Sequence, residues 1–449
     1  MGAEKQYIDL FAQSEELINV HSAPLLNEQR SEAMRHFAKM GFPDKKSERY
    51  RYTDVEQLFA PDYGLNLKQL DVDANPYEAF KCDVPNMSTA LYFIVNDSFY
   101  ETNKVSAELP EGVLVGGLKD IAEKHPEILK KYYAQLADVS KDPVTAFNTA
   151  FAQDGFCIYV PKGVVLDKAI QLVSILRSTI DLIVNRRILI ILEENAQARL
   201  LVCDHTTGTA QFLSTQVVEV FAADNAKLEL YEIEETSRTN TRISNMYIHQ
   251  AQNSSVHVNG MTLTNGTTRN TVDVQLVGRG AEVSLAGIAI EDTNQHVDNH
   301  TYINHKTTDC TSRELYKYVL NDFSTGAFTG RVVVSPGAQR TLSQQTNNNL
   351  CLSKNAKMYA QPQLEIYADD VKCGHGATTG QLDEAALFYM QQRGISQKEA
   401  RMLLMFAFVN EVIDTISMEE LKERLHYLIE KRFRGELNKC GSCSNCKLE

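Results

Sequence analysis

Residues 195–202, NAQARLLV, and their counterpart at 225–230, NAKLEL, decide the fold of this 449-residue chain. Each stretch begins with asparagine, which favours a turn, and continues with a small alanine. Apolar residues then alternate with others, as at Ala198, Leu200 and Val202. Alternation with a period of two is typical of a β-strand that buries one face. The two stretches therefore predict a turn followed by a strand, twice.

The same pairing of a turn-forming residue with a small residue recurs along the chain. Further copies are Ser254-Ser255, Gly280-Ala281, Gly337-Ala338 and Asn355-Ala356. The first four small residues lie 30, 29 and 26 positions apart (196 to 226, 226 to 255 and 255 to 281). Self-similarity at this period indicates a β-solenoid, in which each coil buries its inward face against its neighbours. An antiparallel sandwich with regular hairpins is the alternative.

Helical patterns flank the β region. Residues 27–40 carry helically spaced apolar positions and end at a glycine and a proline. Near the other end, Ser396 with Glu399 and Ser417 with Glu420 each match the S-x-x-E capping box. The helix expected after Ser417 has an apolar stripe and a basic last turn: Leu421, Leu425, Leu428, Ile429, Lys431, Arg432 and Arg434. We expect a helical N-terminal domain over 1–146, a β core over 147–376, a helical C-terminal domain over 377–436 and a tail over 437–449.

Composition and charge restrict the class of protein and the partners that this chain can have. Hydrophobic residues make up 43% of the chain and charged residues 23%, as in ordinary globular proteins. The net charge of −13 argues against nucleic acid or an anionic membrane as the main partner. No apolar run approaches the roughly 18 residues of a spanning helix, and the N-terminus lacks a secretory signal pattern. The nine cysteines are scattered apart from the tail, which suits reduced thiols, so we expect a cytoplasmic protein.

A thiol and an imidazole stand close together where the β pattern gives way to helix. Cys373 and His375 are separated by one glycine, and together they suit iron, copper or zinc. A zinc ion or an iron–sulfur cluster needs three or four protein ligands, so this pair is at most half a site. A metal site, a path for sulfur or iron, and a structural turn all stay open. A second subunit is one source of the missing ligands.

The tail contains three further thiols, Cys440, Cys443 and Cys446, in a C-x2-C-x2-C pattern. Three thiolates at this spacing can hold one metal ion or three corners of a cluster, with a fourth ligand from elsewhere. The alternative is a mobile tail with unmetallated thiols.

A row of histidines near residue 300 also resembles a metal site. In an extended strand His296, Asp298 and His300 share one face. We interpret this row as a solvated or interface face rather than a cation site. The chain has no phosphate-binding loop, nucleophile elbow or zinc-binding H-E-x-x-H helix, so no self-contained active site is expected.

Several short motifs together point to a known family. They are VKCGHGAT at 371–378, GQLD at 380–383, LFY at 387–389, RGI at 393–395 and, near the N-terminus, GFP at 41–43 with RYT at 51–53. With these motifs the chain resembles the SufB/SufD family of iron–sulfur cluster assembly scaffold proteins, and within it the SufD branch. The similarity extends over nearly the whole chain, up to about Leu437.

The resemblance implies a mainly β fold, with a right-handed parallel β-helix core flanked by N-terminal and C-terminal helical domains. It implies a non-catalytic subunit that pairs with SufB through the edge of the last coils. It also implies that the ATPase SufC docks on the C-terminal helices, around Phe388, Tyr389, Arg393, Gly394 and Ile395.

The same resemblance carries expectations for the site. His375, and with it Cys373, would face SufB and share a transient iron–sulfur cluster, while this chain would bind no nucleotide. Self-association of the isolated chain is a further expectation.

Two other functions stay open at this point. One is a purely structural β-helix subunit in which every thiol and imidazole is dispensable. The other is a β-helix enzyme acting on polysaccharide. The second is disfavoured because the chain has no tryptophan for sugar stacking and no well-placed pair of carboxylates.

Overall fold

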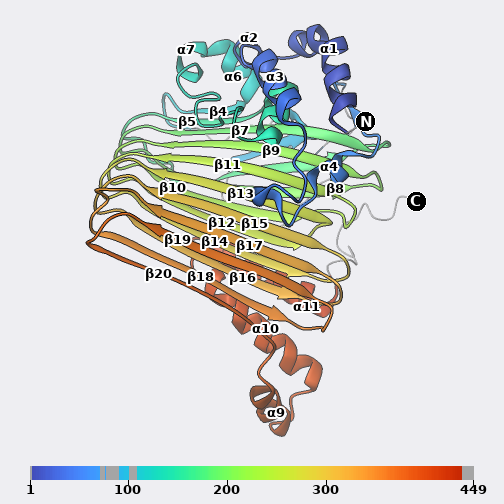
Figure 1. Ribbon diagram of the computed structural model, residues 1–449, viewed down its shortest axis with the longest axis vertical. Helices are drawn as coiled ribbons and strands as arrows, with labels where there is room; N and C mark the ends of the chain where they lie inside the picture. Colours follow the sequence, from blue (N-terminus) through green and yellow to red (C-terminus); the bar gives the residue numbers. More distant parts are fainter. Residues whose placement is uncertain (1–2, 71–75, 77–89, 101–108, 437–449) are drawn as a thin grey trace.

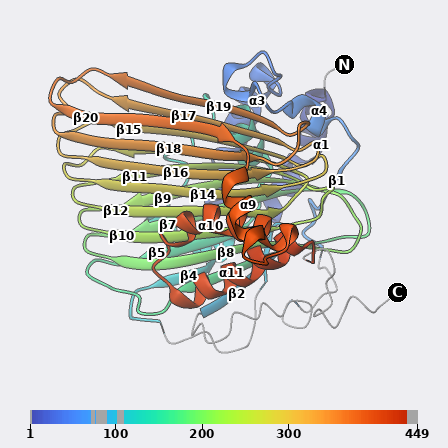
Figure 2. The same ribbon diagram turned by 90° about the horizontal axis from the view of Figure 1, so that it is seen from below.

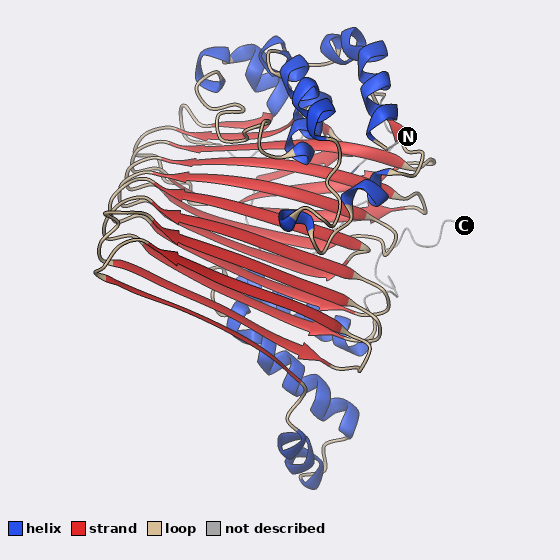
Figure 3. Cartoon of the chain, viewed as in Figure 1, coloured by secondary structure: helices blue, strands red, loops and turns tan. Residues whose placement is uncertain are grey.

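The core of the protein is a parallel β-solenoid (Figure 1). The computed structural model describes residues 3–70, 76, 90–100 and 109–436. In Figure 3 the strands run across the molecule, with helices gathered above and below them. The chain passes alternately through two sheets, and the long strands of each sheet pair in parallel. The predicted parallel solenoid is confirmed, and the alternative of an antiparallel sandwich is wrong.

Among the described residues, each sheet contains ten strands. Sheet A comprises β1 (Gly64–Leu65), β4 (Leu114–Gly117), β5 (Gly155–Val160), β7 (Leu182–Leu192), β9 (Phe212–Ala222), β11 (Thr241–Gln250), β13 (Thr267–Leu276), β15 (His296–His305), β17 (Thr325–Val334) and β19 (Lys357–Ile366). Sheet B comprises β2 (Ala90–Val95), β3 (Ser98–Tyr100), β6 (Ile170–Arg177), β8 (Gln197–Thr207), β10 (Lys227–Glu235), β12 (Ser255–Thr264), β14 (Glu282–Glu291), β16 (Thr311–Leu320), β18 (Thr341–Cys351) and β20 (Val371–Gly380). In the part of the chain that the structure describes, two strand pairings are antiparallel, β2 with β3 and β4 with β5.

The turns between coils follow the repeated pairs. Asn195 and Asn225 adopt left-handed φ angles of +61° and +58°, which asparagine tolerates better than most residues. The alanines that follow them, Ala196 and Ala226, are fully buried. A small residue is required there because the next coil packs directly over it. The repeat seen in the sequence is therefore a stack of equivalent corners.

Three corners differ from the sequence-based prediction. The pair Asn355-Ala356 lies between β18 and β19, where the chain passes from sheet B to sheet A, and Asn355 has no left-handed φ. At the third corner Asn253 has the left-handed φ, +52°, and Ser254 is the buried small residue, so the predicted pair Ser254-Ser255 is one position too late. Another corner, with Asp309 at φ +62° and buried Cys310, was not predicted. Aspartate and cysteine fill the same two roles there as asparagine and alanine elsewhere.

Alternate side chains of both sheets fill the solenoid lumen. Leu200, Leu230 and Val258 of sheet B and Ile190 and Val220 of sheet A belong to one buried apolar cluster that extends through the coils. Each coil thus removes apolar surface from water on both inner walls, which is the main stabilising contribution.

N-terminal helices cover the first coils, at the top of Figure 1. They are α1 (Glu4–Val20), α2 (Pro24–Asn27), α3 (Arg30–Met40), α4 (Val55–Phe59), α6 (Leu118–Lys124), α7 (Pro126–Leu129) and α8 (Pro143–Phe151), with a 3-10 turn, η1, over Glu48–Tyr50. Phe147 of α8 contacts the rings of Tyr7, Phe37 and Phe59, which joins these helices in one core. Gly41, at φ +67°, ends α3 as predicted.

C-terminal helices lie against sheet B. They are α9 (Glu384–Gln392), α10 (Gln397–Ile413) and α11 (Glu419–Arg434). Leu421 and Leu425 of α11 pack with Leu201, Tyr231 and Ile288 on the outer face of the sheet, so the predicted apolar stripe is confirmed. In contrast, α9 buries none of its residues and projects below the solenoid in Figure 1. Within the described ranges, no helix is long and apolar enough to cross a membrane.

One of the two predicted capping boxes is wrong. Ser396 caps α10 by accepting a hydrogen bond from the Glu399 N–H at 3.2 Å. Ser417 does not cap α11: its hydroxyl donates to Glu229, and its own N–H donates to the hydroxyl of Tyr231. Ser417 therefore forms hydrogen bonds with residues of sheet B and does not cap α11, the role that its spacing from Glu420 predicts.

Candidate functional site at the open end of the solenoid

Within the described residues, the solenoid ends in two strands that each have one unpaired edge. β19 and β20 are the terminal strands of sheets A and B, and Figure 2 views the molecule from this end. Large apolar side chains are exposed there: Leu342, Tyr359, Ile366 and Tyr367. A sheet edge offers unpaired N–H and C=O groups to another chain, and natural proteins usually protect it. This end therefore has the properties of a docking edge.

Cys373 and His375 lie on β20, on one face of the edge strand. Val371 and Cys373 pack against the apolar cluster of the lumen. Because side chains alternate along a strand, His375 lies on the same inward side. Cys373 is half-buried, whereas His375 is exposed because no further coil covers it. Among the described residues, no three His, Cys, Asp or Glu side chains are grouped to hold a metal ion, so this chain offers the pair alone.

A chain of hydroxyl groups leads away from Cys373 into the lumen. Ser343 on β18 is the register partner of Cys373. It accepts a hydrogen bond from Ser312 Oγ at 2.8 Å, and Ser312 in turn lies 2.9 Å from Nε2 of His305. Burial raises the pKa of the Cys373 thiol, and the backbone of Ser343 acts in the opposite direction. Burial also lowers the pKa of His305 to about 4, so its ring is neutral near pH 7.

A second polar row leads inward from His375. Its register partner on β18 is Gln345, whose own partner on β16 is Glu314. The amide Nε2 of Gln345 donates to Oε2 of Glu314, and both side chains are buried. Burial raises the pKa of Glu314 above its usual value. The carboxyl is therefore held toward its neutral form.

The sequence analysis did not predict these polar residues of the lumen. Five of the six inward positions of β18 are polar and buried: Thr341, Ser343, Gln345, Asn347 and Asn349. The sixth is the half-buried Cys351. The signal was the run TLSQQTNNNL itself, because its alternation lacks the apolar residues that line earlier coils. On β18, next to the terminal strand β20, the lumen wall of sheet B thus changes from apolar to hydrogen-bonding.

The face of β15 that carries the histidine row is largely covered: Asp298 is buried, whereas His296 and His300 are half-buried. The part of the interpretation that made this face solvated is therefore wrong. Asp298 is 1% exposed and forms an ion pair with Arg269 of β13. Thr53 also donates to Asp298 Oδ2 at 2.7 Å and lies 3.1 Å from Nε2 of His296. Burial lowers the pKa of His300 to about 3. The N-terminal segment covers this face, which alternation within one strand could not indicate.

The residues expected at the second interface lie around α9. Phe388 and Tyr389 are 62% and 60% exposed, and Arg393 donates to the Tyr389 hydroxyl at 3.0 Å. Gly394 turns the chain with φ +86°, and Ile395 is half-buried. A hollow of about 260 Å³ lies beside them. Its lining is Cys351, Leu352, Gln381, Leu382, Glu384, Leu387, Phe388, Gln391, Gln397 and Arg401.

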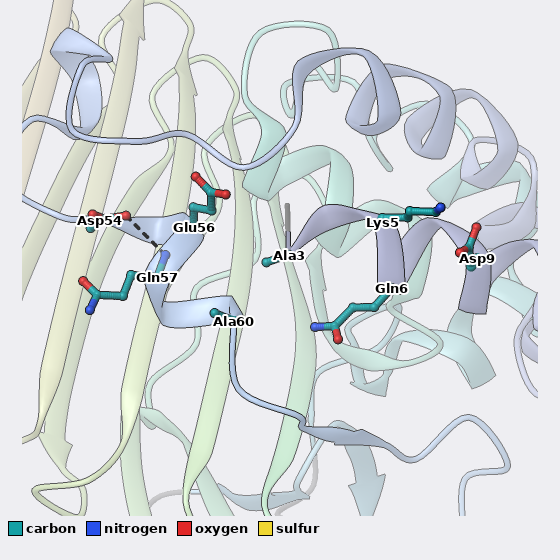
Figure 4. Close-up of a pocket in the computed structure, with 8 residues that line it drawn as sticks. All are labelled: Ala3, Lys5, Gln6, Asp9, Asp54, Glu56, Gln57 and Ala60. Atoms are coloured by element: carbon teal, nitrogen blue, oxygen red, sulfur yellow. Dashed lines mark hydrogen bonds between the residues drawn. The ribbon is translucent and has the colours of Figure 1, made fainter. Parts of the chain in front are cut away.

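A larger open groove, of about 700 Å³, lies between α1 and α4 (Figure 4). Its lining is Ala3, Lys5, Gln6, Asp9, Asp54, Glu56, Gln57 and Ala60. It contains no thiol or imidazole and none of the predicted site residues, so we assign it no role. The tail thiols Cys440, Cys443 and Cys446 lie outside the described residues, and their metal or sulfur binding stays a prediction.

Comparison with known families identifies two matching regions. Residues 175–408 match the description "SUF system FeS cluster assembly, SufBD core domain". Residues 1–172 match "SufBD protein N-terminal region". The core match spans the coils from β7 onward and includes Cys373 and His375.

Individual relatives agree with these matches. An iron–sulfur cluster assembly SufBD family protein of Synechocystis is 25% identical over 419 residues, which covers 91% of each chain. The iron–sulfur cluster assembly protein SufD of Escherichia coli is 30% identical over 244 residues, covering 54% of this chain and 58% of the relative. SufD of Bacillus subtilis is 25% identical over 356 residues, covering 78% and 81%.

Proposed function

Because the chain belongs to the SufB/SufD family of iron–sulfur cluster assembly proteins, we propose that it is a non-catalytic scaffold subunit of the SufD type, acting in the cytoplasm. The observation that carries the proposal is the position of His375, exposed on the last strand of an open solenoid end. There it can complete a ligand set with a second protein. The cluster is cargo that forms across the interface and then leaves.

SufB is the proposed partner at this end. Its own solenoid edge would pair with β19 and β20 and cover the apolar residues exposed there. His375, with Cys373 beside it, would then supply one or two ligands, and SufB would supply the rest. The two chains together would meet the need for three or four ligands that this chain alone does not.

The test is a His375→Ala variant co-expressed with SufB and SufC and purified without oxygen. We expect the three proteins to co-purify as in wild type, with iron and sulfide in the complex reduced by about tenfold. Lys372→Ala is the matched control, because this neighbour is also exposed but points to the other side of β20. Unchanged iron and sulfide in the His375→Ala complex would overturn the ligand role and favour a purely structural subunit.

SufC is the proposed partner of the C-terminal helices. α9 has no buried residue, yet it presents two large aromatic rings to solvent at Phe388 and Tyr389. Aromatic residues that are exposed in the free protein and covered in a complex are frequent anchors of binding. Arg393, Gly394 and Ile395 continue the same surface. The ATPase would supply nucleotide chemistry, and this chain would supply the docking helix.

A double variant, Phe388→Ala with Tyr389→Ala, tests this surface. We expect SufC to be lost from the purified complex while the melting temperature of the isolated chain stays within about 1 °C, since exposed residues contribute little to stability. Tyr427→Ala on α11 is the control, because Tyr427 is also exposed, at 46%, but lies on another helix. Retention of SufC by the double variant would contradict the proposal.

A further inference from the structure

We propose that Gln345 is a positioning residue for His375: its free amide oxygen accepts a ring N–H of His375 and turns the other ring nitrogen toward the incoming metal. This inference rests on the proposed function, in which His375 is a ligand. Histidine ligands usually donate their second ring N–H to a fixed acceptor, which sets the tautomer and the ring orientation. The structure contains such an acceptor at the register position directly beneath His375.

The side-chain amide of Gln345 has a hydrogen-bonded nitrogen and an oxygen without a hydrogen-bond partner. Nε2 donates to Oε2 of Glu314, whereas Oε1 has no hydrogen-bond partner although Gln345 is fully buried. A buried acceptor without a partner costs about 1–3 kcal/mol, so it is a feature that needs a reason. Because His375 shares the inward side of β20, a rotation of its exposed ring toward the lumen would supply the missing donor.

Glu314 holds the amide in this orientation. Burial favours the neutral form of its carboxyl, so Gln345 is fixed without adding a charge beneath the site. In the structure the amide Nε2 faces Glu314, which leaves Oε1 as the atom available to His375. The pair acts as a fixed, uncharged acceptor.

The opposite wall of the lumen is shaped around the same amide. Gly330 lies on β17, and a Cβ added there would fall 2.1 Å from Nε2 of Gln345 and 2.9 Å from the ring of Phe328. Only glycine leaves room for the amide to lie across the lumen. Gln345 is thus anchored by a carboxyl on one side and accommodated by a glycine on the other, which is a built arrangement rather than a chance contact.

The decisive experiment measures the tautomer of His375 in the whole isolated chain by ¹⁵N nuclear magnetic resonance. Protonated and unprotonated ring nitrogens have distinct shifts, and the His375 signal is assigned by its loss in His375→Ala. In wild type we expect one tautomer to predominate. In Gln345→Met, which preserves the side-chain volume but removes the acceptor, we expect the mixture of a free imidazole. The same ratio of the two tautomers in wild type and in Gln345→Met would overturn the inference.

Three further variants guard against a trivial effect on folding. Gly330→Ala changes no polar group but displaces the amide, so it should shift the tautomer as Gln345→Met does. The exchange Glu314→Gln with Gln345→Glu keeps an acceptor under His375 and should preserve the wild-type tautomer. Asn347→Leu removes another buried amide from the same row, in register with Ala377 instead, and should leave the tautomer unchanged.

A second arm separates this inference from the proposed function. In the complex with SufB and SufC, ferrous iron added without oxygen should bind about 10–100 times more weakly to Gln345→Met than to wild type, as expected for loss of an outer partner of a ligand. If His375→Ala leaves iron binding unchanged while the tautomer responds to Gln345, the proposed function fails, and of this inference only the hydrogen bond between Gln345 and His375 stands. If His375→Ala weakens iron binding and the tautomer does not respond, the positioning role fails alone.

Discussion

The ring of Tyr52 stacks on the ring of Tyr359, with centroids 4.7 Å apart and planes inclined by 19°. Tyr52 belongs to the N-terminal segment just after η1, whereas Tyr359 lies on β19, the last strand of sheet A. The segment that covers the buried face of β15 therefore continues to the open end. A segment of the N-terminal domain thus packs on the coil that finishes the solenoid.

A double-mutant cycle on Tyr52→Ala and Tyr359→Ala should yield a coupling of about 0.5–1.5 kcal/mol in the free energy of unfolding, the usual range for a stacked aromatic pair. Urea denaturation of the four proteins measures it. Tyr427 stacks on neither ring, so the cycle of Tyr52→Ala with Tyr427→Ala should show no coupling. Zero coupling between Tyr52 and Tyr359 would mean that the stack is not maintained in solution.

Asp298→Ala should destabilise the protein by about 3–5 kcal/mol, because it leaves the buried guanidinium of Arg269 without its carboxylate. Thr53 loses its hydrogen-bond acceptor at the same time. The measurement is equilibrium unfolding in urea. Asp309→Asn provides the contrast, because Asp309 pairs with Arg279 and Arg340 at an exposed corner and asparagine tolerates its left-handed φ of +62°, so loss of the charge should cost less than about 1 kcal/mol.

The contribution of Glu234 to the free energy of unfolding should decrease as the pH rises from about 5 to 8. Burial raises the pKa of Glu234 to about 7, against the opposing charge of Arg242. The folded state then binds the proton more tightly than the unfolded state, whose carboxyl has an ordinary pKa near 4.5. The stabilising contribution is therefore complete below that value and is lost as the pH passes 7.

Glu234→Gln isolates this effect. The difference in unfolding free energy between wild type and Glu234→Gln should change by up to roughly 3 kcal/mol between pH 5 and pH 8, with wild type losing stability relative to the variant. Thr262 and Thr268 donate to Glu234 in the folded protein, and glutamine retains an oxygen that can accept from them. A difference that stays constant with pH would mean that Glu234 is ionised throughout this range.

Ser396→Ala should destabilise the C-terminal helices by about 1 kcal/mol, since it removes the side chain that caps α10. Hydrogen exchange of the first turn of α10 is the suitable measurement, because the effect is local. Ser417→Ala should leave the exchange of the first turn of α11 nearly unchanged and instead release Glu229 and Tyr231 of β10. Faster exchange confined to the start of α11 would restore the capping role that the sequence predicts for Ser417.

Much of the candidate site could be predicted from the sequence because it is local. Cys373 and His375 are two positions apart in a strand, so alternation alone puts them on one side. Gln345 and Glu314 could not be found this way. Their relation to His375 depends on the register between β16, β18 and β20, and register is set by corners that lie about thirty residues apart.

The sequence by itself determined the solenoid, its repeated corners, and the helices at both ends, because each depends on turn formers and apolar periods within a few residues. Only the tertiary structure decided which polar groups are buried and what they contact. Asp298 is covered by the segment around Thr53, some 250 positions earlier in the chain. The Gln345 amide lies against Gly330 on the opposite wall of the lumen. Such contacts depend on how distant coils stack, and the spacing within one strand carries no information about that stacking.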